Sequence, residues 1–132
     1  MSGETNLDVL LANMSPELIP GEYVFHSFKD AVYGDHAHLE PFGAVMEAEG
    51  LTLVIPKAKA DEHGVAYESV LQGITLNVHS SLEAVGLTAA FSNKLAEHGI
   101  SANVLAGYFH DHIFVQSELA EQAMDALGEL SF

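Results

Sequence analysis

Imidazole is the side chain with the greatest capacity for metal or acid–base chemistry here, because the 132-residue chain has eight histidines and no cysteine. The histidines gather in two motifs, His36-Ala37-His38 beside Asp35 and Glu40, and His110-Asp111-His112. A zinc site needs three or four ligands in a defined geometry, and one H-x-H pair supplies only two. Both motifs are therefore typical of polar loops, and His110 and His112 remain the candidate metal pair.

Motifs for catalysis are missing from the sequence. It contains no Gly-x-Ser-x-Gly elbow, phosphate-binding loop, dinucleotide fingerprint or HExxH pair. The lack of cysteine excludes disulfides, thiol catalysis and cysteine-ligated zinc. We therefore expect a protein that is not an enzyme and has no cofactor. The alternative is an active site assembled from residues that are far apart in the sequence.

The charge balance restricts the partners of the protein. Four lysines, no arginine and 19 acidic residues give a formal net charge of −15. Such a chain cannot build the basic face that binds nucleic acid, and it repels phosphate and anionic lipid. Residues 1–6 do not resemble a signal peptide, and no apolar run reaches the ~20 residues that span a bilayer. We expect a cytoplasmic protein whose acidity maintains solubility, and a cationic partner is the alternative.

Hydrophobic spacing predicts the elements of the first half. Apolar residues at helical spacing indicate a helix over 7–14, which Ser15-Pro16 ends because proline disfavours helical geometry in the preceding residue. Strands are expected over three segments, of which the last two form a hairpin through Glu49-Gly50: 22–28, 44–47 and 51–55. Residues 29–41 have no periodicity and should form a loop. A short helix over 57–63 should end at Gly64.

The second half has a clearer pattern. Residues 66–78 should run extended, and a helix within 82–98 buries Leu87, Phe91 and Leu95 on one face. Gly99 is placed to end that helix in the left-handed conformation. Strands over 101–108 and 112–116 then form a hairpin, and Ser117 is expected to cap a last helix.

This second half resembles an ACT domain. The matching features are Val85-Gly86 at a helix start, Ala89-Ala90-Phe91 and Leu95-Ala96 along it, and Gly99-Ile100 leading into Asn103-Val104. They are similar to the regulatory ACT repeats of aspartate kinases. The hairpin Gly107-Tyr108-Phe109-His110-Asp111-His112 resembles that of a small stand-alone bacterial family with tandem ACT-like units.

The resemblance implies an α+β fold of ferredoxin-like βαββαβ architecture, with antiparallel sheets and helices on one face. Two tandem units are expected, and the first is degenerate because the 29–41 loop replaces a helix. The corresponding division is an N-terminal helix and turn over 1–21, a degenerate ACT-like unit over 22–72 and an ACT domain over 73–132. The extended 66–78 segment would connect the two units.

The resemblance also implies a ligand site. In amino-acid-binding ACT domains the ligand lies at the loop between the first strand and the first helix. Unpaired N–H groups at a helix start favour a carboxylate, and glycine lets a ligand approach the backbone. The residues concerned are His79, Ser80, Ser81, Val85, Gly86, Leu87 and Asn103. The alternative roles are tight packing for Gly86, an ordinary strand position for Asn103, and a capping box for Ser80 with Glu83.

A homodimer or dimer of dimers is expected as well, because Leu105 and Phe114 should lie on the sheet face that the helices leave uncovered. Three functions follow from these observations. The first is a regulatory protein that binds an amino acid or similar small metabolite. The alternatives are a protein–protein interaction module without a ligand and a histidine-based metal-binding protein.

Overall fold

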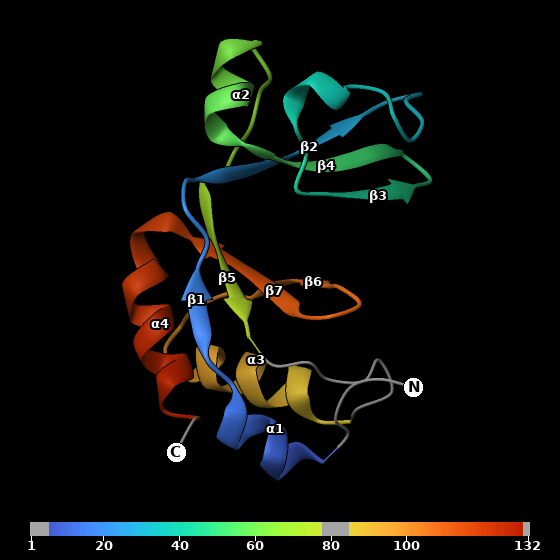
Figure 1. Ribbon diagram of the computed structural model, residues 1–132. Coiled ribbons are helices and arrows are strands. Elements are labelled where there is room, and N and C mark those ends of the chain that lie inside the picture. The colour runs from blue at the N-terminus through green and yellow to red at the C-terminus, as the bar shows by residue number, and fades with distance from the viewer. Residues whose placement is uncertain (1–5, 78–84, 131–132) are drawn as a thin grey trace. The chain divides into compact units, whose positions relative to one another are not determined.

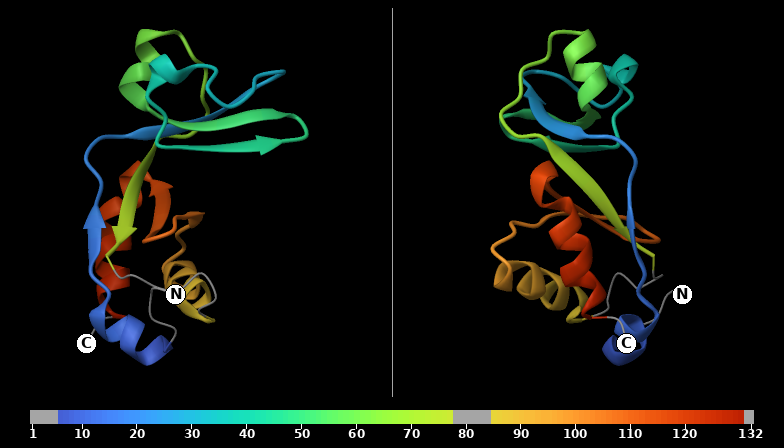
Figure 2. Two further views of the ribbon diagram at one scale, coloured as in Figure 1. Left: turned by 45° about the vertical axis from the view of Figure 1, so that its right-hand side comes forward. Right: turned by 90° about the vertical axis from the view of Figure 1, so that its left-hand side faces the viewer.

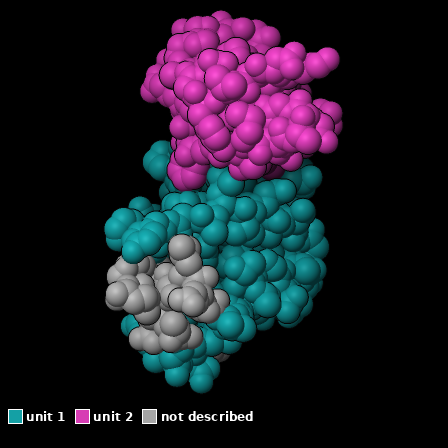
Figure 3. All heavy atoms as spheres, turned by 90° about the vertical axis from the view of Figure 1, so that its right-hand side faces the viewer, with its two compact units in different colours: residues 1–20, 72–132 teal, residues 21–71 magenta. Residues whose placement is uncertain are grey.

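The computed structural model describes residues 6–77 and 85–130, and the chain forms two compact units (Figure 3). Unit 1 combines Met1–Pro20 with Gln72–Phe132, and unit 2 is Gly21–Leu71. The N-terminal segment therefore belongs to the same unit as the C-terminal half of the chain. Unit 2 is inserted between these two parts of unit 1.

Four strands form the sheet of unit 1, in the order β1-β5-β7-β6 (Figure 1). Strand β5 (Leu71–Leu76) pairs antiparallel with β1 (Pro16–Leu18), and β6 (Asn103–Ala106) pairs antiparallel with β7 (Asp111–Gln116). Strand β1 corrects the sequence analysis, which placed only a helix end and a turn there. The N-terminal segment thereby supplies a fourth strand that the second half of the sequence lacks.

The helices of unit 1 cover one face of this sheet. They are α1 (Leu7–Asn13), α3 (Leu87–Glu97) and α4 (Ala120–Gly128), with a short 3-10 turn η2 (Ser117–Leu119) before α4. Alternate residues of β5 and β7 enter the shared core, as expected when one sheet face is buried. The core includes Ile74, Leu76, Ile113 and Val115 from the sheet, and Leu10, Phe91, Leu95, Ala123 and Leu127 from the helices.

The ends of these helices partly follow the sequence pattern. Gly99 has φ +72°, and Ile100 donates its N–H to the Leu95 carbonyl at 2.9 Å, which confirms the left-handed C-cap. The capping role expected for Ser117 is wrong. Its hydroxyl donates to Gln72 Oε1 at 3.1 Å, and a 3-10 turn precedes α4 instead.

Unit 2 has a three-stranded sheet in the order β3-β4-β2 and one α-helix (Figure 2). Its elements are β2 (Tyr23–Phe28), η1 (Ala37–Leu39), β3 (Gly43–Glu47), β4 (Gly50–Pro56) and α2 (Lys57–Glu62). The β3–β4 hairpin turns through residues 48–49, so Gly50 already belongs to β4 rather than to the turn. Strand β2 is followed by a loop with one short 3-10 helix, where a complete ACT repeat has an α-helix.

The core of unit 2 lies on one face of its sheet. It contains Val24, Leu51, Leu53 and Ile55 from the strands, Ala60 from α2, and Ala31 and Leu39 from the loop. Two loop residues therefore cover the sheet where a second helix is missing. The α+β prediction of two tandem units with antiparallel strands and helices on one face is confirmed.

Candidate ligand site

The start of α3 is the helix end at which the ligand site was predicted. Gly86 is the N-cap with φ +100°, and among the described residues no side chain caps this end. The first regular helical bond runs from the Ala90 N–H to the Gly86 carbonyl at 2.9 Å. Thr88 and Ala89, in the first turn, are exposed. Amides in this position attract an anionic group, and the helix is long enough for its dipole to contribute.

Leu7 of α1 occupies the space beside this helix start. A Cβ atom on Gly86 would lie 3.0 Å from Leu7 Cδ2, which is tighter than ordinary van der Waals contact. Glycine is therefore required here both for its positive φ and for the approach of α1. The packing role considered for Gly86 is real, although its neighbour is a helix rather than the sheet. A ligand at this helix end would share the space with Leu7.

A double-mutant cycle separates the two requirements at Gly86. Gly86→Ala is expected to destabilise the protein by about 1–3 kcal/mol, because of the positive φ and the contact with Leu7. In a Leu7→Ala background the contact disappears, so the cost of the same change should fall to about 1–2 kcal/mol. Urea unfolding measures all four free energies. Additive effects would show that Leu7 does not restrict this position.

The other residues predicted at this site have mixed placements. Val85 is 83% exposed, whereas Leu87 is 3% exposed and its side chain belongs to the core, so Leu87 can offer a ligand only its backbone. The Asn103 amide donates to the Phe114 carbonyl at 3.1 Å, across the β6–β7 ladder. This bond occupies part of the donor capacity proposed for a ligand. His79, Ser80 and Ser81, with the capping partner Glu83, lie outside the described residues.

A second group of polar side chains lies at the β6–β7 turn. The Asp111 carboxyl is half-buried, burial raises its pKa above the ordinary value, and His112 and His110 oppose that rise. No described residue donates a hydrogen bond to this carboxylate. Beside it, His110 Nδ1 is fully buried and has no hydrogen-bond partner among the described residues. Buried polar atoms are normally paired, so this turn has unused hydrogen-bonding capacity.

The neighbouring His112 is tied to the sheet. Its Nδ1 lies 3.0 Å from Thr75 Oγ1 on β5, and burial, followed by the charge of His110, lowers the pKa of His112 while Asp111 opposes this. The cross-strand register adds Leu105 opposite His112 and Glu17 opposite Thr75. Because core residues alternate with these positions, the four side chains form one row on the sheet face away from the helices. The sequence analysis identified His112 but missed Thr75, which only the strand pairing brings to it.

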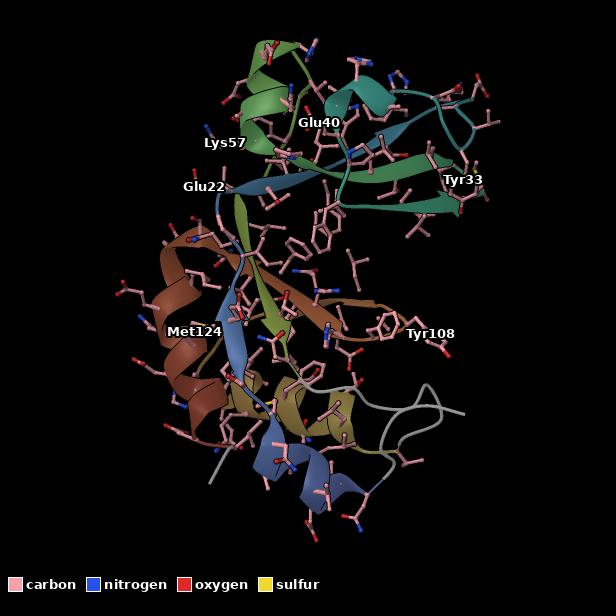
Figure 4. All side chains as sticks on the ribbon, viewed as in Figure 1. Glu22, Tyr33, Glu40, Lys57, Tyr108 and Met124 are labelled. Atoms are coloured by element: carbon pink, nitrogen blue, oxygen red, sulfur yellow. The ribbon has the colours of Figure 1, made fainter. Side chains whose placement is uncertain are left out.

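The turn itself is closely packed and carries two exposed aromatic rings. The Gly107 N–H donates to the His110 carbonyl at 2.9 Å, and a Cβ on Gly107 would lie 2.9 Å from the same oxygen. Tyr108 and Phe109 are 61% and 59% exposed, and their rings meet edge to face at 5.1 Å. Figure 4 labels Tyr108 at the tip of this hairpin. Exposed aromatic side chains two and three positions before a carboxylate in the sequence suit a cationic group.

The metal hypothesis gains no third ligand. Within residues 6–77 and 85–130, no group of three histidine or acidic side chains is arranged to hold a metal ion. The histidines of the His36-Ala37-His38 motif make ring contacts instead. His36 stacks on Phe28 at 4.0 Å, and His38 meets His63 edge to face at 4.8 Å. His110 and His112 thus remain a two-nitrogen candidate.

The homodimer was predicted from two apolar residues on the uncovered sheet face, Leu105 and Phe114, and one of them is not accessible to a second chain. Phe114 is fully buried within the chain, and Leu105 is half-buried. A second chain would therefore gain little apolar contact at Phe114. Among the described helices, none is long and apolar enough to span a bilayer.

Two α+β units, each with antiparallel strands and helices on one sheet face, define a tandem α+β fold. Sequence models of the ACT domain match residues 2–72 and residues 69–129. The chain therefore belongs to the ACT-domain family, and its first half, which was predicted to be a degenerate unit, is matched by a model of its own.

Solved structures agree with this assignment. A protein of unknown function from Vibrio cholerae, described as a possible transport protein, is 55% identical over 99% of this chain and 100% of its own, with a TM-score of 0.87. The ligand-free regulatory subunit of aspartate kinase from Thermus thermophilus is 10% identical over 92% of this chain and 99% of its own, with a TM-score of 0.68. The second likeness concerns the fold alone. No curated protein matches the chain.

Proposed function

We propose that this protein is a non-catalytic regulatory protein that binds an amino acid or similar small metabolite through the ACT domain in its C-terminal half. The observation that carries the proposal is the half-buried Asp111 carboxylate, which receives no hydrogen bond from the described residues and lies beside the buried, unpaired His110 Nδ1. Burial of a carboxylate without a donor costs free energy. Retaining such a group is understandable where a ligand completes it.

The chemistry of this turn specifies one end of the ligand. A carboxylate without a donor pairs best with an ammonium group, because charge-assisted hydrogen bonds are stronger than neutral ones. The Tyr108 and Phe109 rings would add favourable contacts to a cation. The strong negative charge of the chain attracts cations over a longer range. We therefore assign the ligand's ammonium group to the Asp111 turn.

The start of α3 supplies the chemistry for the other end. Its uncapped amides favour a carboxylate, and Val85, Gly86 and Leu87 would contribute through their backbone. We propose Asn103 as a contact through its amide oxygen, since its nitrogen donates to Phe114. His79, Ser80 and Ser81 complete the proposed site as first inferred from the sequence.

A ligand screen tests this function directly. The full chain is heated with each of the twenty amino acids, and the compounds that stabilise it are then titrated by calorimetry. A true ligand at 100 times its Kd should stabilise the folded state by about 2.7 kcal/mol. For each such compound, the Nα-acetyl derivative should bind at least about tenfold more weakly, because it has lost the ammonium charge.

The controls decide between the alternatives. Stabilisation by Zn²⁺ or Ni²⁺ with no response to any amino acid would replace this proposal with metal binding at His110 and His112. No response to amino acids or to metals would reject both. Equal binding of the acetylated and free forms would leave a small-molecule site but remove Asp111 from it.

A further inference from the structure

One stretch of unit 2 concentrates exposed apolar side chains. Of the ten large apolar residues that are exposed in the described chain, five lie between positions 32 and 46. Three of these form one surface, which we term the loop patch: Val32 and Tyr33 on the 29–41 loop, and Met46 on strand β3. Their exposed fractions are 59%, 62% and 40%. Apolar side chains gathered on a surface mark a contact site, whereas isolated ones are ordinary.

Hydrogen bonds hold the loop patch together. The Met46 N–H donates to the Tyr33 hydroxyl at 3.1 Å, which ties the loop to β3 (Figure 4 labels Tyr33). Met46 lies opposite Leu51, a core residue of β4, so its side chain is on the sheet face that the loop covers. The Val32 N–H donates to the Asp35 carboxylate at 2.9 Å, which fixes the turn that presents Val32 and Tyr33. The patch therefore offers a partner positioned side chains.

Carboxylates accompany the loop patch. Residues 29–49 contain five acidic residues and one lysine. Glu40 is paired with Lys59 at 2.9 Å. The other four are exposed and make no ion pair with a lysine in the described part of the chain: Asp30, Asp35, Glu47 and Glu49. The hydrogen bonds that Asp35 and Glu47 accept from the Val32 N–H and the Thr52 hydroxyl leave the negative charges uncompensated.

The packing of Gly50 brings the two ends of this acidic stretch together. A Cβ atom on Gly50 would lie 2.7 Å from the Phe28 carbonyl oxygen and 3.1 Å from Lys29 Cα. The β3–β4 turn therefore lies against the start of the loop, and Glu49 and Asp30 gather at the same end of unit 2. Like charges that gather in this way repel one another, so a cationic group placed among them is stabilised.

We propose that the loop patch binds a segment of a different protein, one in which lysine or arginine side chains are interspersed with apolar ones. The apolar side chains would contact the patch, and the cations would pair with the carboxylates around it. Arginine could also stack on the exposed Tyr33 ring. A second copy of this chain does not fit, because it has four lysines, no arginine and a net charge of −15. Nucleic acid and anionic lipid are repelled by the same charge. This inference is independent of the proposed ligand site.

Fluorescence anisotropy of the full chain with three labelled synthetic peptides of equal length tests the proposal. One peptide combines leucine with lysine, one serine with lysine, and one leucine with glutamate. The leucine–lysine peptide should bind about tenfold more tightly than the serine–lysine peptide, because it alone supplies apolar contacts as well as charge. The leucine–glutamate peptide should not bind. The affinity of the leucine–lysine peptide should fall as salt rises, because salt screens exposed charge pairs.

Paired substitutions in the full chain locate the binding surface. Val32→Ser with Met46→Gln should weaken binding of the leucine–lysine peptide by about fivefold or more, because both apolar contacts are lost. Asp30→Asn with Glu49→Gln should weaken it by about 2- to 30-fold, as expected for the loss of two exposed charge pairs. All four positions are exposed, so the core of unit 2 should stay intact.

Matched variants of unit 1 control for general attraction to an acidic protein. Glu118→Gln with Glu121→Gln removes two exposed carboxylates, and Val9→Ser changes an exposed apolar residue of α1. Each should change the affinity by less than about twofold. Circular dichroism checks that every variant is folded. Equal binding of the serine–lysine and leucine–lysine peptides, equal losses in the control and patch variants, or no binding of any peptide would overturn the proposal. Self-association that disappears with Val32→Ser and Met46→Gln would assign the patch to a second copy instead.

Discussion

Asp111→Asn is expected to stabilise the ligand-free protein at pH 7 and to lower its affinity for the ammonium-bearing ligand by about tenfold or more. Asparagine has nearly the same shape as aspartate but carries no charge, so the half-buried position penalises it less. The ligand, however, loses a charged partner. Opposite effects on stability and binding are the signature of a group kept for function rather than for the fold.

The pH dependence follows from the direction of the Asp111 shift. Burial raises the pKa of this carboxyl in the folded state, so its contribution to stability is fully present below the ordinary value of 3.8 and is lost as pH rises through the folded-state pKa. The gain from Asp111→Asn should therefore be largest near neutral pH and should vanish below pH 3.8. Urea unfolding at several pH values between these limits measures the gain.

A matched variant controls for the loss of one negative charge. Asp125 is an exposed carboxylate on α4 in the same unit. Asp125→Asn reduces the net charge equally but should leave ligand affinity unchanged. If both variants stabilise the protein by the same amount, general charge repulsion explains the gain. If Asp111→Asn binds the ligand as tightly as the wild type, Asp111 has no place in the site.

Local periodicity explains what could be predicted of the fold. The spacing of Leu87, Phe91 and Leu95 identified α3, and runs of strand-forming residues separated by turns identified β4 and the β6–β7 hairpin, because each pattern is complete within one short segment. Strand β1 lacked such a signal. It has three residues, begins with a proline, and exists because Pro16 pairs with Leu76, sixty positions later. A single sequence does not reveal that partner.

The candidate site, like the fold, could be predicted only in part. Gly86 and the His110-Asp111-His112 motif are visible in the sequence, and the resemblance to ACT domains placed them at a helix start and a hairpin. The contacts that these residues make join positions far apart in the sequence, so the sequence did not reveal them. Leu7 reaches Gly86 from α1, and Thr75 reaches His112 from β5. One signal could have singled out Asp111: a carboxylate between two histidines at the start of a buried strand.

The loop of unit 2 is the part of the fold that periodicity could not describe. Its backbone adopts the left-handed region at three residues other than glycine, namely Asp30, His36 and Glu40. Such conformations cost free energy and persist only where surrounding contacts hold them. The contacts here are Ala31 and Leu39 in the core and an ion pair of 2.9 Å between Lys59 and Glu40. Exposed ion pairs contribute little, so we expect the buried side chains to contribute more than this pair to holding the loop.

Leu39→Ala should consequently destabilise unit 2 by about 2–5 kcal/mol, as expected for a fully buried leucine. Leu39 is 1% exposed, whereas Val32 in the same loop is 59% exposed. Val32→Ala should therefore change stability by no more than about 0.5 kcal/mol. Hydrogen exchange of the β2 and β4 amides reports on unit 2 separately from unit 1. Equal, small effects of both substitutions would mean that the loop does not replace the missing helix as part of the core. A large effect of Leu39→Ala alone would show that one buried side chain on an irregular loop covers the core of unit 2 in place of a helix.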